Sequence, residues 1–422
     1  MIDCARCPPP PALASLHPFD PGVLADPWDY YRRVREHAPA WREPNTGIFL
    51  ISSHAAVSAV LRDWERFSNR FGRALGGLGE PPPEVLAVAE QGYPPVDTML
   101  TADPPEQRRF RKLVNRAFSA KRVETLEGRI EEIANELVDR CEGRRRAELL
   151  AEFAQPLPLT VIAEQLGAPR EDLARFRKWT DGFVAQLSGV ADLAGQVAAA
   201  RLIVEFQHYF AARLEERRKE PHDDIISDIV HAEVEGERPL DLTEMLSILQ
   251  QLLVAGNETT ASAIVEGMWL LIQHPEELAR VQRDATLVPG LVEEVLRLAT
   301  PTANMWRICK EDAEVEGTAI PAGSLCMLRF AAANRDPDQF SDPDRFDVSR
   351  ANAAEHLAFG MGIHHCLGAA LARKEMQVAF RTLLARLDGF ALDASAPAPR
   401  HRPSVLLWGF DSLPITYQRR LT

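Results

Sequence analysis

Helical hydrophobic patterns dominate the chain between about residues 105 and 274. Apolar residues recur there at intervals of three and four with charged residues between them, which is the spacing of a helix with one buried face. The clearest examples are residues 106–117, 122–141 and 198–219. This pattern predicts a fold that is mainly α.

Short apolar runs bounded by Gly and Pro indicate a few strands. They cover residues 47–52, 303–308, 324–328 and 405–408. Because these runs are few and short, we expect small peripheral β-sheets on a mainly α (α+β) fold. Residues 69–103 differ, since many Gly and Pro residues interrupt any long element. A loop of this length in a compact domain is often functional, for example as a lid.

The longest helical pattern covers residues 243–274. Asp241 and Glu244 form a capping-box sequence at its start, and Pro275 follows its end. At 1.5 Å per residue, such a helix would be about 45 Å long, the width of a domain. Its middle, residues 248–264, is apolar on most faces, so we expect the helix to cross the core.

One carboxylate, Glu258, falls within this apolar segment. A buried carboxylate costs several kcal/mol unless it is paired or functional. Gly256 weakens the helix by about 1 kcal/mol relative to Ala, and Thr259 can direct its hydroxyl to the Ala255 carbonyl or to a ligand. We therefore expect the helix to open locally, which gives a groove with an acid and an alcohol. The alternative is a helix kink in which Glu258 reaches solvent or a buried arginine.

A second unusual segment is Phe359-Gly-Met-Gly-Ile-His-His-Cys-Leu-Gly368. Its three glycines let the backbone turn tightly and approach a flat partner closely. Cys366 lies just before a helical run at 369–387, where free amides and the helix dipole stabilise a thiolate, the form that binds a metal. One alternative is a buried, inert cysteine. Another is zinc bound by His364, His365 and Cys366, although zinc ligands are normally two to four residues apart.

Composition and charge exclude several classes of protein. The 422 residues are 46% hydrophobic and 26% charged, which excludes collagen-like repeats and short disulfide scaffolds. The net charge of −13 disfavours a nucleic acid as partner. The six cysteines are too sparse for a disulfide-stapled secreted fold, and we find neither a signal peptide nor a membrane-spanning run. We therefore expect a cytoplasmic protein.

The sequence contains no internal repeat, flexible linker or break in composition that would mark a domain boundary. We therefore expect a single domain over residues 21–422, preceded by a disordered tail at residues 1–20. Cys4 and Cys7 in this tail have the spacing of a redox or zinc pair. They lack a second Cys/His pair nearby and precede a run of prolines, which favours the tail.

Together these segments resemble the cytochrome P450 family of haem-thiolate monooxygenases, with similarity from about residue 20 to 414. The cysteine segment matches the family pattern Phe-Gly-x-Gly-x-His-x-Cys-x-Gly at every fixed position, and residues 255–260 match its Ala-Gly-x-acid-Thr-Thr pattern. Glu294 and Arg297 match its Glu-x-x-Arg helix, and Arg345 corresponds to the arginine that completes a buried triad. The alternative for this Glu-Arg motif is a surface ion pair.

The resemblance implies a P450 fold with haem b beneath the long helix and Cys366 as the axial ligand of the iron. The positions that correspond to propionate-binding residues of the family are Gln107, Arg111, Arg307 and His364. Further cofactor-binding positions are Ala255, Gly256, Phe359, Gly360 and Gly368. The positions that face the substrate are Val254, Ala255, Ala303, Asn304, Leu406 and Leu407. Most of the latter are apolar, which suits a small hydrophobic substrate.

The resemblance also implies the reaction, a hydroxylation that uses O2. Glu258 and Thr259 would be the catalytic pair, with Glu258 relaying protons from solvent and Thr259 holding the oxygen as it is reduced. Electrons would come from NAD(P)H through a separate ferredoxin and ferredoxin reductase, and the enzyme would be a monomer. Arg109, Lys112 and Arg116 share one helix face and are candidates for docking the ferredoxin, unless they are simply solvated charges.

Two other functions stay open. A peroxide-driven peroxygenase would use hydrogen peroxide directly, although such relatives typically lack the acid and alcohol that Glu258 and Thr259 supply. A non-catalytic haem-binding protein would have no need of a proton relay and would give no product with any oxidant.

Overall fold

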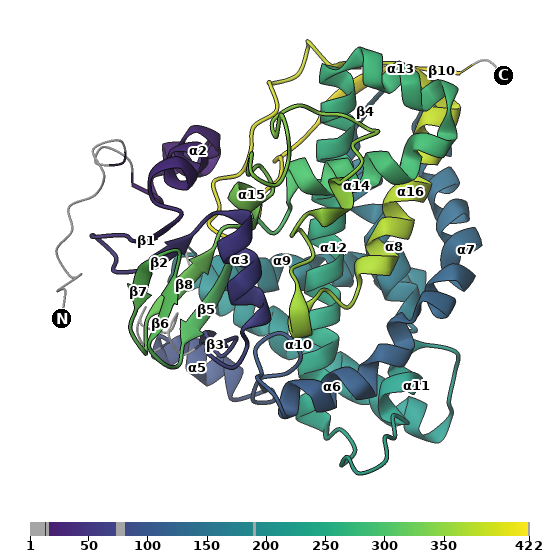
Figure 1. Cartoon of the computed structure of the whole chain (residues 1–422). Coiled ribbons are helices and arrows are strands. Elements are labelled where there is room, and N and C mark those ends of the chain that lie inside the picture. The colour runs from purple at the N-terminus through teal and green to yellow at the C-terminus, as the bar shows by residue number, and fades with distance from the viewer. Residues whose placement is uncertain (1–12, 14–16, 73–80, 189–190, 421–422) are drawn as a thin grey trace.

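The computed structural model describes residues 13, 17–72, 81–188 and 191–420, and helices form most of it (Figure 1). The helices of the first half are α1 Pro21–Ala25, α2 Trp28–His37, α3 His54–Arg62, α5 Pro83–Ala89, α6 Glu106–Val114, α7 Ala120–Asp139, α8 Pro156–Gln165, α9 Leu173–Ser188 and α10 Leu193–Lys219. The later helices are α11 Ile225–Val230, α12 Leu242–Gln273, α13 Pro275–Arg283, α14 Val288–Ala299, α15 Phe330–Ala333 and α16 Ala369–Arg386. The mainly α class is therefore confirmed.

Ten short strands form three sheets among the described residues. The five-stranded sheet has the order β1-β2-β8-β5-β3, the three-stranded sheet the order β4-β10-β9, and β6 pairs with β7. The strands are β1 Ala40–Arg42, β2 Phe49–Ile51, β3 Phe67–Ser68, β4 Arg146–Glu148, β5 Met305–Cys309, β6 Ala313–Val315, β7 Thr318–Ile320, β8 Leu325–Leu328, β9 Leu387–Leu392 and β10 Pro414–Arg419. Figure 1 shows the largest sheet beside the helical body, so the expected peripheral sheets are confirmed.

Three of the four predicted β-like runs become β2, β5 and β8. The fourth, residues 405–408, forms no strand. It lies at the tip of a hairpin, where Leu407 makes an isolated bridge to Thr302. The prediction was wrong there because a short apolar run can equally belong to a turn that packs inside the protein.

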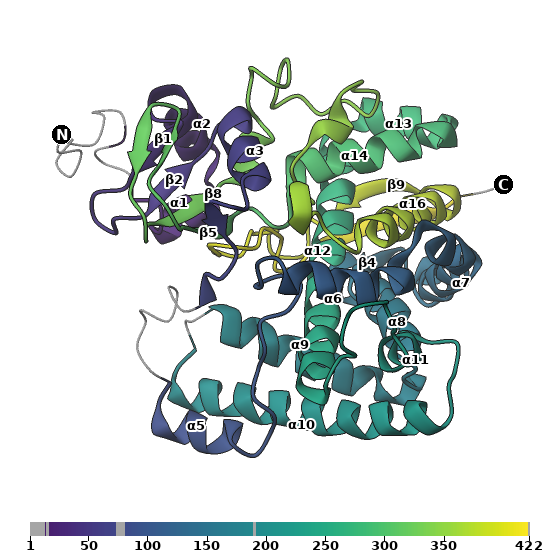
Figure 2. The ribbon, with the colours of Figure 1, turned by 60° about the horizontal axis from the view of Figure 1, so that its bottom comes forward.

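The long helix α12 begins at its predicted capping box. The Asp241 carboxylate accepts a hydrogen bond from the amide of Glu244, and the Glu244 side chain accepts one from the amide of Asp241. Pro275 begins α13 immediately after the turn at His274. In Figure 2, α12 passes from the region of α13 and α14 to that of α9 and α10, so it crosses the molecule as expected.

Two hydrophobic clusters surround α12. Its second half packs with α14 and α16, where a Cβ atom at Gly267 would lie 2.4 Å from the ring of Phe380. Only glycine permits this approach, because a Cβ atom essentially never lies so close to another side chain. Its first half packs with α9 and α10, through residues such as Leu249 and Phe210. The core therefore holds α12 along most of its length.

The predicted lid at residues 69–103 is partly ordered by a helix and a close contact. Helix α5 lies in it and packs against α10. Gln207 of α10 accepts a hydrogen bond from the Tyr93 amide at 2.8 Å and donates one to the Tyr93 carbonyl at 2.9 Å. Residues 73–80 lie outside the described part of the chain, and whether the segment acts as a lid stays a prediction.

Part of the predicted N-terminal tail is also described. Leu13 is 1% exposed and packs in a cluster with Tyr30 and Trp408, which differs from the expectation of disorder at that position. Cys4 and Cys7 lie outside the described residues. Among the helices that the structure describes, none is both long and apolar enough to cross a membrane.

Candidate functional site

The cysteine segment forms a tight loop before α16. Gly360 and Gly362 have positive φ angles of 64° and 72°, which favour glycine. A Cβ atom at Gly362 would lie 2.6 Å from the carbonyl oxygen of Leu61, so this position also needs glycine for space. The Cys366 amide donates to the Phe359 carbonyl at 2.9 Å and closes the loop.

The thiol of Cys366 lies deep in the protein, yet the residue is exposed. Burial raises the pKa of this thiol, against hydrogen bonds from the amides of Gly368 and Ala369 and the charges of Arg111 and Arg373. Open space lies beside Gly360 and Gly368 of the same loop, and this space next to the exposed Cys366 is here termed the hollow. The helix terminus alone predicted a stabilised thiolate. In the chain alone, desolvation of the sulfur outweighs the effect of the helix terminus and favours the protonated thiol. A bound metal cation would restore the thiolate.

The middle of α12 also borders open space. Ala255 and Gly256 are exposed although the helix crosses the core. A Cβ atom at Gly256, Gly360 or Gly368 would meet no described atom within 4 Å, so open space lies beside all three glycines. Phe359 packs in the cluster of the second half of α12, and Leu367 in that of the first half. The loop therefore packs in the clusters that surround both halves of α12, and each of the two elements leaves open space beside its glycines.

The expected opening of α12 is not present. Helical structure continues without a break from Leu242 to Gln273, and the Thr259 hydroxyl donates to the Ala255 carbonyl at 2.8 Å. Of the two positions expected for this hydroxyl, the structure shows the one bonded to the helix. Exposed Ala255 and Gly256 provide space along an intact helix.

Glu258 lies beside Thr259 and is bonded to an arginine from a distant part of the chain. Arg402 donates to Glu258 Oε1 at 2.5 Å, and the two side chains are 37% and 11% exposed. The buried carboxylate is therefore paired, and its partner reaches the solvent. On α9, Asp181 also lies near: burial raises the pKa of Asp181 and the Glu258 charge adds to this shift, while the charges of Arg177 and Arg402 oppose it.

Two predicted propionate positions, Arg307 and His364, carry buried groups for which the described part of the chain supplies no anionic partner. Burial lowers the pKa of Arg307 to about 10, opposed by the charge of Asp103. Asp103 already accepts hydrogen bonds from Ser68 and from the Asn69 amide. Among the described residues, the Arg307 guanidinium donates to the Trp306 carbonyl and to no carboxylate.

His364 lies beside Arg307. Burial, followed by the charge of Arg307, lowers the pKa of His364 to about 4. Its Nδ1 lies 3.2 Å from the Met99 carbonyl oxygen, while its Nε2 is buried with no partner in the described part of the chain. In the neutral ring the proton lies on Nδ1, which faces the Met99 carbonyl, and a neighbouring carboxylate would favour protonation of Nε2 as well. A guanidinium and an imidazole that can gain a proton, in a chain that also exposes a thiol, fit a cofactor with carboxylate groups and a metal ion. The residues present therefore fit haem.

The other two predicted propionate residues bond to the cysteine loop. Gln107 donates to the Ile363 carbonyl at 2.7 Å, and Arg111 donates to the His365 carbonyl at 2.7 Å. Burial lowers the pKa of Arg111, and the Cys366 charge opposes this shift. These side chains from α6 hold the loop in place beside the cysteine.

The predicted triad needs a correction. Arg297 donates to both oxygens of Glu294 at 2.7 and 2.8 Å, and both side chains are fully buried. The third member is Arg350, whose Nε lies 3.1 Å from Glu294 Oε1, whereas the Arg345 side chain is 66% exposed. The chain turns between Asp342 and Arg345, which directs the Arg345 carbonyl toward Arg297 and the side chain outward.

The predicted substrate-facing segments lie side by side. The Ala303 amide donates to the Leu406 carbonyl at 2.8 Å, and Asn304 donates to the Val405 carbonyl at 2.5 Å. Leu406 and Leu407 are partly buried, as is Val254 on α12. The Asn304 side-chain nitrogen, Nδ2, makes this bond to the Val405 carbonyl. The side-chain oxygen, Oδ1, has no partner among the described residues.

The predicted docking face also needs a correction. Arg109 is buried and bonds to both oxygens of Glu244 at 2.8 and 3.0 Å, because the phase of α6 turns it toward the start of α12. Lys112 stays exposed, at 55%, and pairs with Glu237. The side chain of Arg116 lies outside the described structure.

Sequence reasoning missed two arginines of this site, Arg350 and Arg402. Neither belongs to a segment whose spacing indicated a buried partner. A search for a cation to pair with Glu258 could have found the second, because a buried carboxylate requires one.

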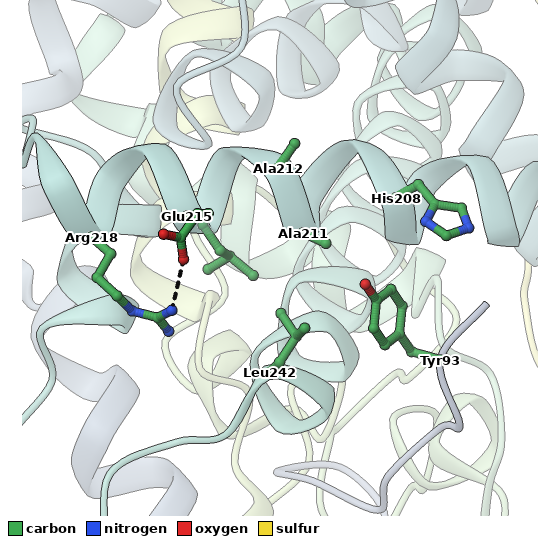
Figure 3. A pocket seen from close by; sticks show the side chains of 8 residues that line it. Tyr93, His208, Ala211, Ala212, Glu215, Arg218 and Leu242 are labelled. Carbon is green, nitrogen blue, oxygen red and sulfur yellow. Dashed lines mark hydrogen bonds and ion pairs between the residues drawn. The ribbon is translucent and has the colours of Figure 1, made fainter.

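A pocket of about 390 Å³ lies elsewhere on the surface, between α10, Tyr93 and the start of α12 (Figure 3). Tyr93 and Leu242 lie across from the α10 residues, and Arg218 pairs with Glu215 at 2.9 Å. None of the eight lining residues belongs to the predicted cofactor or substrate positions. This pocket is therefore separate from the hollow beside Cys366.

Comparison with known proteins identifies the family. A family profile described as Cytochrome P450 matches residues 196–409. Cytochrome P450 monooxygenase PikC of Streptomyces venezuelae is 38% identical over 415 residues, which cover 97% of this chain and 95% of that protein. The polyketide biosynthesis cytochrome P450 PksS of Bacillus subtilis is 34% identical over 414 residues, 96% of this chain and 99% of that protein.

A solved structure agrees with the sequence comparison. Cytochrome P450 CYP109Q5 from Chondromyces apiculatus superposes with a TM-score of 0.84 at 38% identity, over 96% of this chain and 98% of that one. With an accessible cysteine in the loop of the family motif, these matches show that the chain belongs to the cytochrome P450 family and is a haem monooxygenase.

Proposed function

We propose that this enzyme hydroxylates a small hydrophobic substrate with O2, using electrons that a ferredoxin and its reductase deliver from NAD(P)H. The observation that carries the proposal is the exposure of Cys366, in the loop of the family motif, together with the exposed turn of α12 at Ala255 and Gly256 inside a helix that crosses the core. The acid and alcohol of the proposed catalytic pair, Glu258 and Thr259, lie on that same stretch of α12.

Haem b supplies the iron that activates O2 when it is bound. Cys366 would be the iron ligand, with the amides of Gly368 and Ala369 bonded to its sulfur to moderate its basicity. Arg307 and His364, protonated at Nε2 by the neighbouring carboxylates, would bind the propionates. Two other proposed cofactor residues, Gln107 and Arg111, hold the cysteine loop through its carbonyls, and Phe359 at the start of the loop packs in the hydrophobic cluster of the second half of α12.

Proton delivery would depend on Glu258 and Thr259. Arg402 connects Glu258 to the solvent, because it is more exposed than the carboxylate that it binds. When Arg402 releases Oε1, that oxygen can accept a proton at the surface side and carry it inward. Thr259 would then rotate its hydroxyl from the Ala255 carbonyl toward the oxygen being reduced.

The ferredoxin would dock on the cysteine side, near α6. With Arg109 buried, Arg108 and Lys112 are exposed cations of this helix, and Arg111 of the same helix bonds to the cysteine loop. A positive site on a chain of net charge −13 would steer an acidic partner. We expect Lys112→Glu to slow reduction by the ferredoxin at low salt and to have little effect at high salt.

The apolar Leu406, Leu407 and Val254 support a hydrophobic substrate. We propose a polyketide-derived compound as the first class to test, because PksS is named for polyketide biosynthesis. Asn304 Oδ1 is the polar atom available to orient it.

The proposal is tested with purified, haem-loaded protein. Reduction and addition of carbon monoxide should give the red-displaced Soret band of a thiolate ligand, and Cys366→His should abolish it while haem stays bound. Turnover is then compared with ferredoxin, reductase and NAD(P)H, and with hydrogen peroxide alone. The substrates tested are polyketide-derived compounds and other hydrophobic compounds that shift the spin state of the haem. Product only with peroxide would show a peroxygenase. No product from any of these compounds under either condition would show a non-catalytic haem protein.

A further inference from the structure

Residues 400–411 form a hairpin, here termed the C-terminal hairpin, that lies on α12. Its two arms pair at His401 and Phe410. The Arg402 amide donates to the Gly409 carbonyl at 3.0 Å, and the Asp411 amide donates to the Arg400 carbonyl at 2.9 Å. These bonds make the hairpin a distinct unit, although the structure assigns it no strand.

The hairpin contacts α12 at three positions spaced by four residues. Arg402 bonds to Glu258, a Cβ atom at Gly409 would lie 2.5 Å from Ser262 Oγ, and His401 Nε2 lies 2.7 Å from Glu266 Oε1. Residues at this spacing form one stripe along a helix. The stripe is about 12 Å long. Two adjacent residues of the hairpin, Arg402 and His401, bond to its two ends, Glu258 and Glu266.

The contact of His401 with Glu266 is more buried than the contact of Arg402 with Glu258. The Glu266 side chain is 4% exposed and that of His401 is 17% exposed. The His401 ring stacks on Trp408 and Phe410, with ring centroids 4.0 and 3.9 Å away, so the facing arm of the hairpin holds it. A hydrogen bond from a clamped ring to a buried carboxylate fixes the base of the hairpin on the helix.

The tip of the hairpin is bonded to residues 301–303, which precede β5. The Trp408 amide donates to the Pro301 carbonyl and the Ala303 amide to the Leu406 carbonyl, both at 2.8 Å. The hairpin therefore joins α12 to the predicted substrate-facing segment. A shift of its base would change both Leu406 and the position of Arg402.

Other charged groups lie beside this contact. Arg335 lies near Glu266, Asp411 lies 3.6 Å from Arg402 Nε, and Asp181 lies near Glu258. Asp411 competes with Glu258 for Arg402. Arg402 thus needs a fixed backbone to stay on Glu258, and His401 is the residue before it.

We infer that His401, through its bond to Glu266, is a positioning residue that keeps Arg402 on Glu258 and so controls proton delivery during O2 reduction. This inference rests on the proposed role of Glu258. It assigns a function to the buried Glu266, which the proposed reaction does not use.

The experiment combines hydrogen exchange with a double-mutant cycle on the haem-loaded enzyme. His401→Phe keeps a ring on Trp408 and Phe410 but removes the bond to Glu266. We expect the amides of Arg402, Trp408 and Asp411 to exchange about fivefold to tenfold faster, as for loss of one hydrogen bond that limits local opening. Glu266→Gln keeps an acceptor for His401, so exchange should stay closer to that of the natural protein.

The second readout is the amount of product formed per NAD(P)H consumed. We expect His401→Phe and Arg402→Gln each to lower it about threefold, and the double variant to be no worse than Arg402→Gln, because His401 acts through Arg402. Arg400→Gln, in the same hairpin, is the matched control and should change neither readout. Additive effects of the two substitutions, or unchanged exchange in His401→Phe, would overturn the inference.

Two further variants separate the possible failures. If Glu266 without its partner prevents folding of His401→Phe, the variant Glu266→Leu with His401→Phe removes the unpaired carboxylate and should show the same faster exchange and lower product ratio. Glu258→Gln tests the proposed function itself. If it leaves the product ratio unchanged, the role of Glu258 is wrong, and the inference that depends on it is overturned with it.

Discussion

Replacement of Arg350 by leucine tests the corrected triad. The Arg350 side chain is 7% exposed, and its Nε lies 3.1 Å from Glu294 Oε1. Its Nη atoms donate to the carbonyls of Ser341, Asp342 and Arg345 at 2.7, 3.1 and 2.9 Å. Leucine removes all four interactions and leaves the buried Glu294 with one arginine in place of two.

The expected loss of stability follows from these contacts. Breaking a buried ion pair by removing one partner costs about 3–5 kcal/mol. Glu294 is fully buried but keeps Arg297, so we expect the lower end of that range. The backbone carbonyls lie in exposed turns, where water replaces much of the lost bonding. We therefore expect Arg350→Leu to lower the free energy of unfolding by about 3 kcal/mol.

The assay is chemical denaturation followed by circular dichroism and by the Soret band. Arg345→Leu is the matched control, since that side chain is 66% exposed and surface substitutions usually change stability by less than about 0.5 kcal/mol. A greater loss in Arg345→Leu than in Arg350→Leu would refute the assignment of Arg350. Equal losses would refute the argument from burial.

The other predictions concern pH, uncoupling and cofactor retention. Burial raises the pKa of Glu293, but hydrogen bonds from His356 and Arg373 outweigh it and lower the pKa to about 2. Glu293→Gln should therefore lower the free energy of unfolding by about 1–2 kcal/mol at pH 7. This difference from the natural protein should disappear as pH falls from about 4.3 toward 2, which denaturation at each pH measures. Thr259→Ala should cut product per NAD(P)H about tenfold while NAD(P)H consumption continues; product that falls only in step with consumption would contradict the role of its hydroxyl. Arg307→Met should weaken haem retention about tenfold, measured by transfer to apomyoglobin, without destabilising the haem-free protein, because it removes a buried charge that lacks a carboxylate.

The elements that sequence predicted well are those with strong local signals. Helix α12 combines a capping box, a long apolar pattern and a proline after its end, and each signal acts through neighbouring residues. The cysteine loop was predictable for the same reason, because Gly360 and Gly362 are required by backbone angles that glycine favours. The family motif then added the roles of residues far apart in the chain.

The errors concern the direction in which a side chain points. Arg109 and Lys112 share a face by spacing, yet one is buried against Glu244 and the other exposed, because the neighbours of α6 decide which side is covered. Arg345 was chosen by its place in a motif, but the turn before it directs its side chain outward. Such directions depend on tertiary packing, which spacing alone does not contain.

The shifts in pKa around the hollow have one physical cause. Burial is the main influence on the pKa of Cys366, Arg307 and His364, and in each case it favours the neutral form. These three groups cannot stabilise one another's charged forms, because the thiol stays protonated and none of them then carries a negative charge. A cofactor with a metal cation on the sulfur side and carboxylates on the cation side relieves all three at once. The same desolvation that disfavours these charges in the chain alone therefore strengthens their bonds to haem, and binding of haem should stabilise the fold by an amount that grows with the logarithm of its affinity.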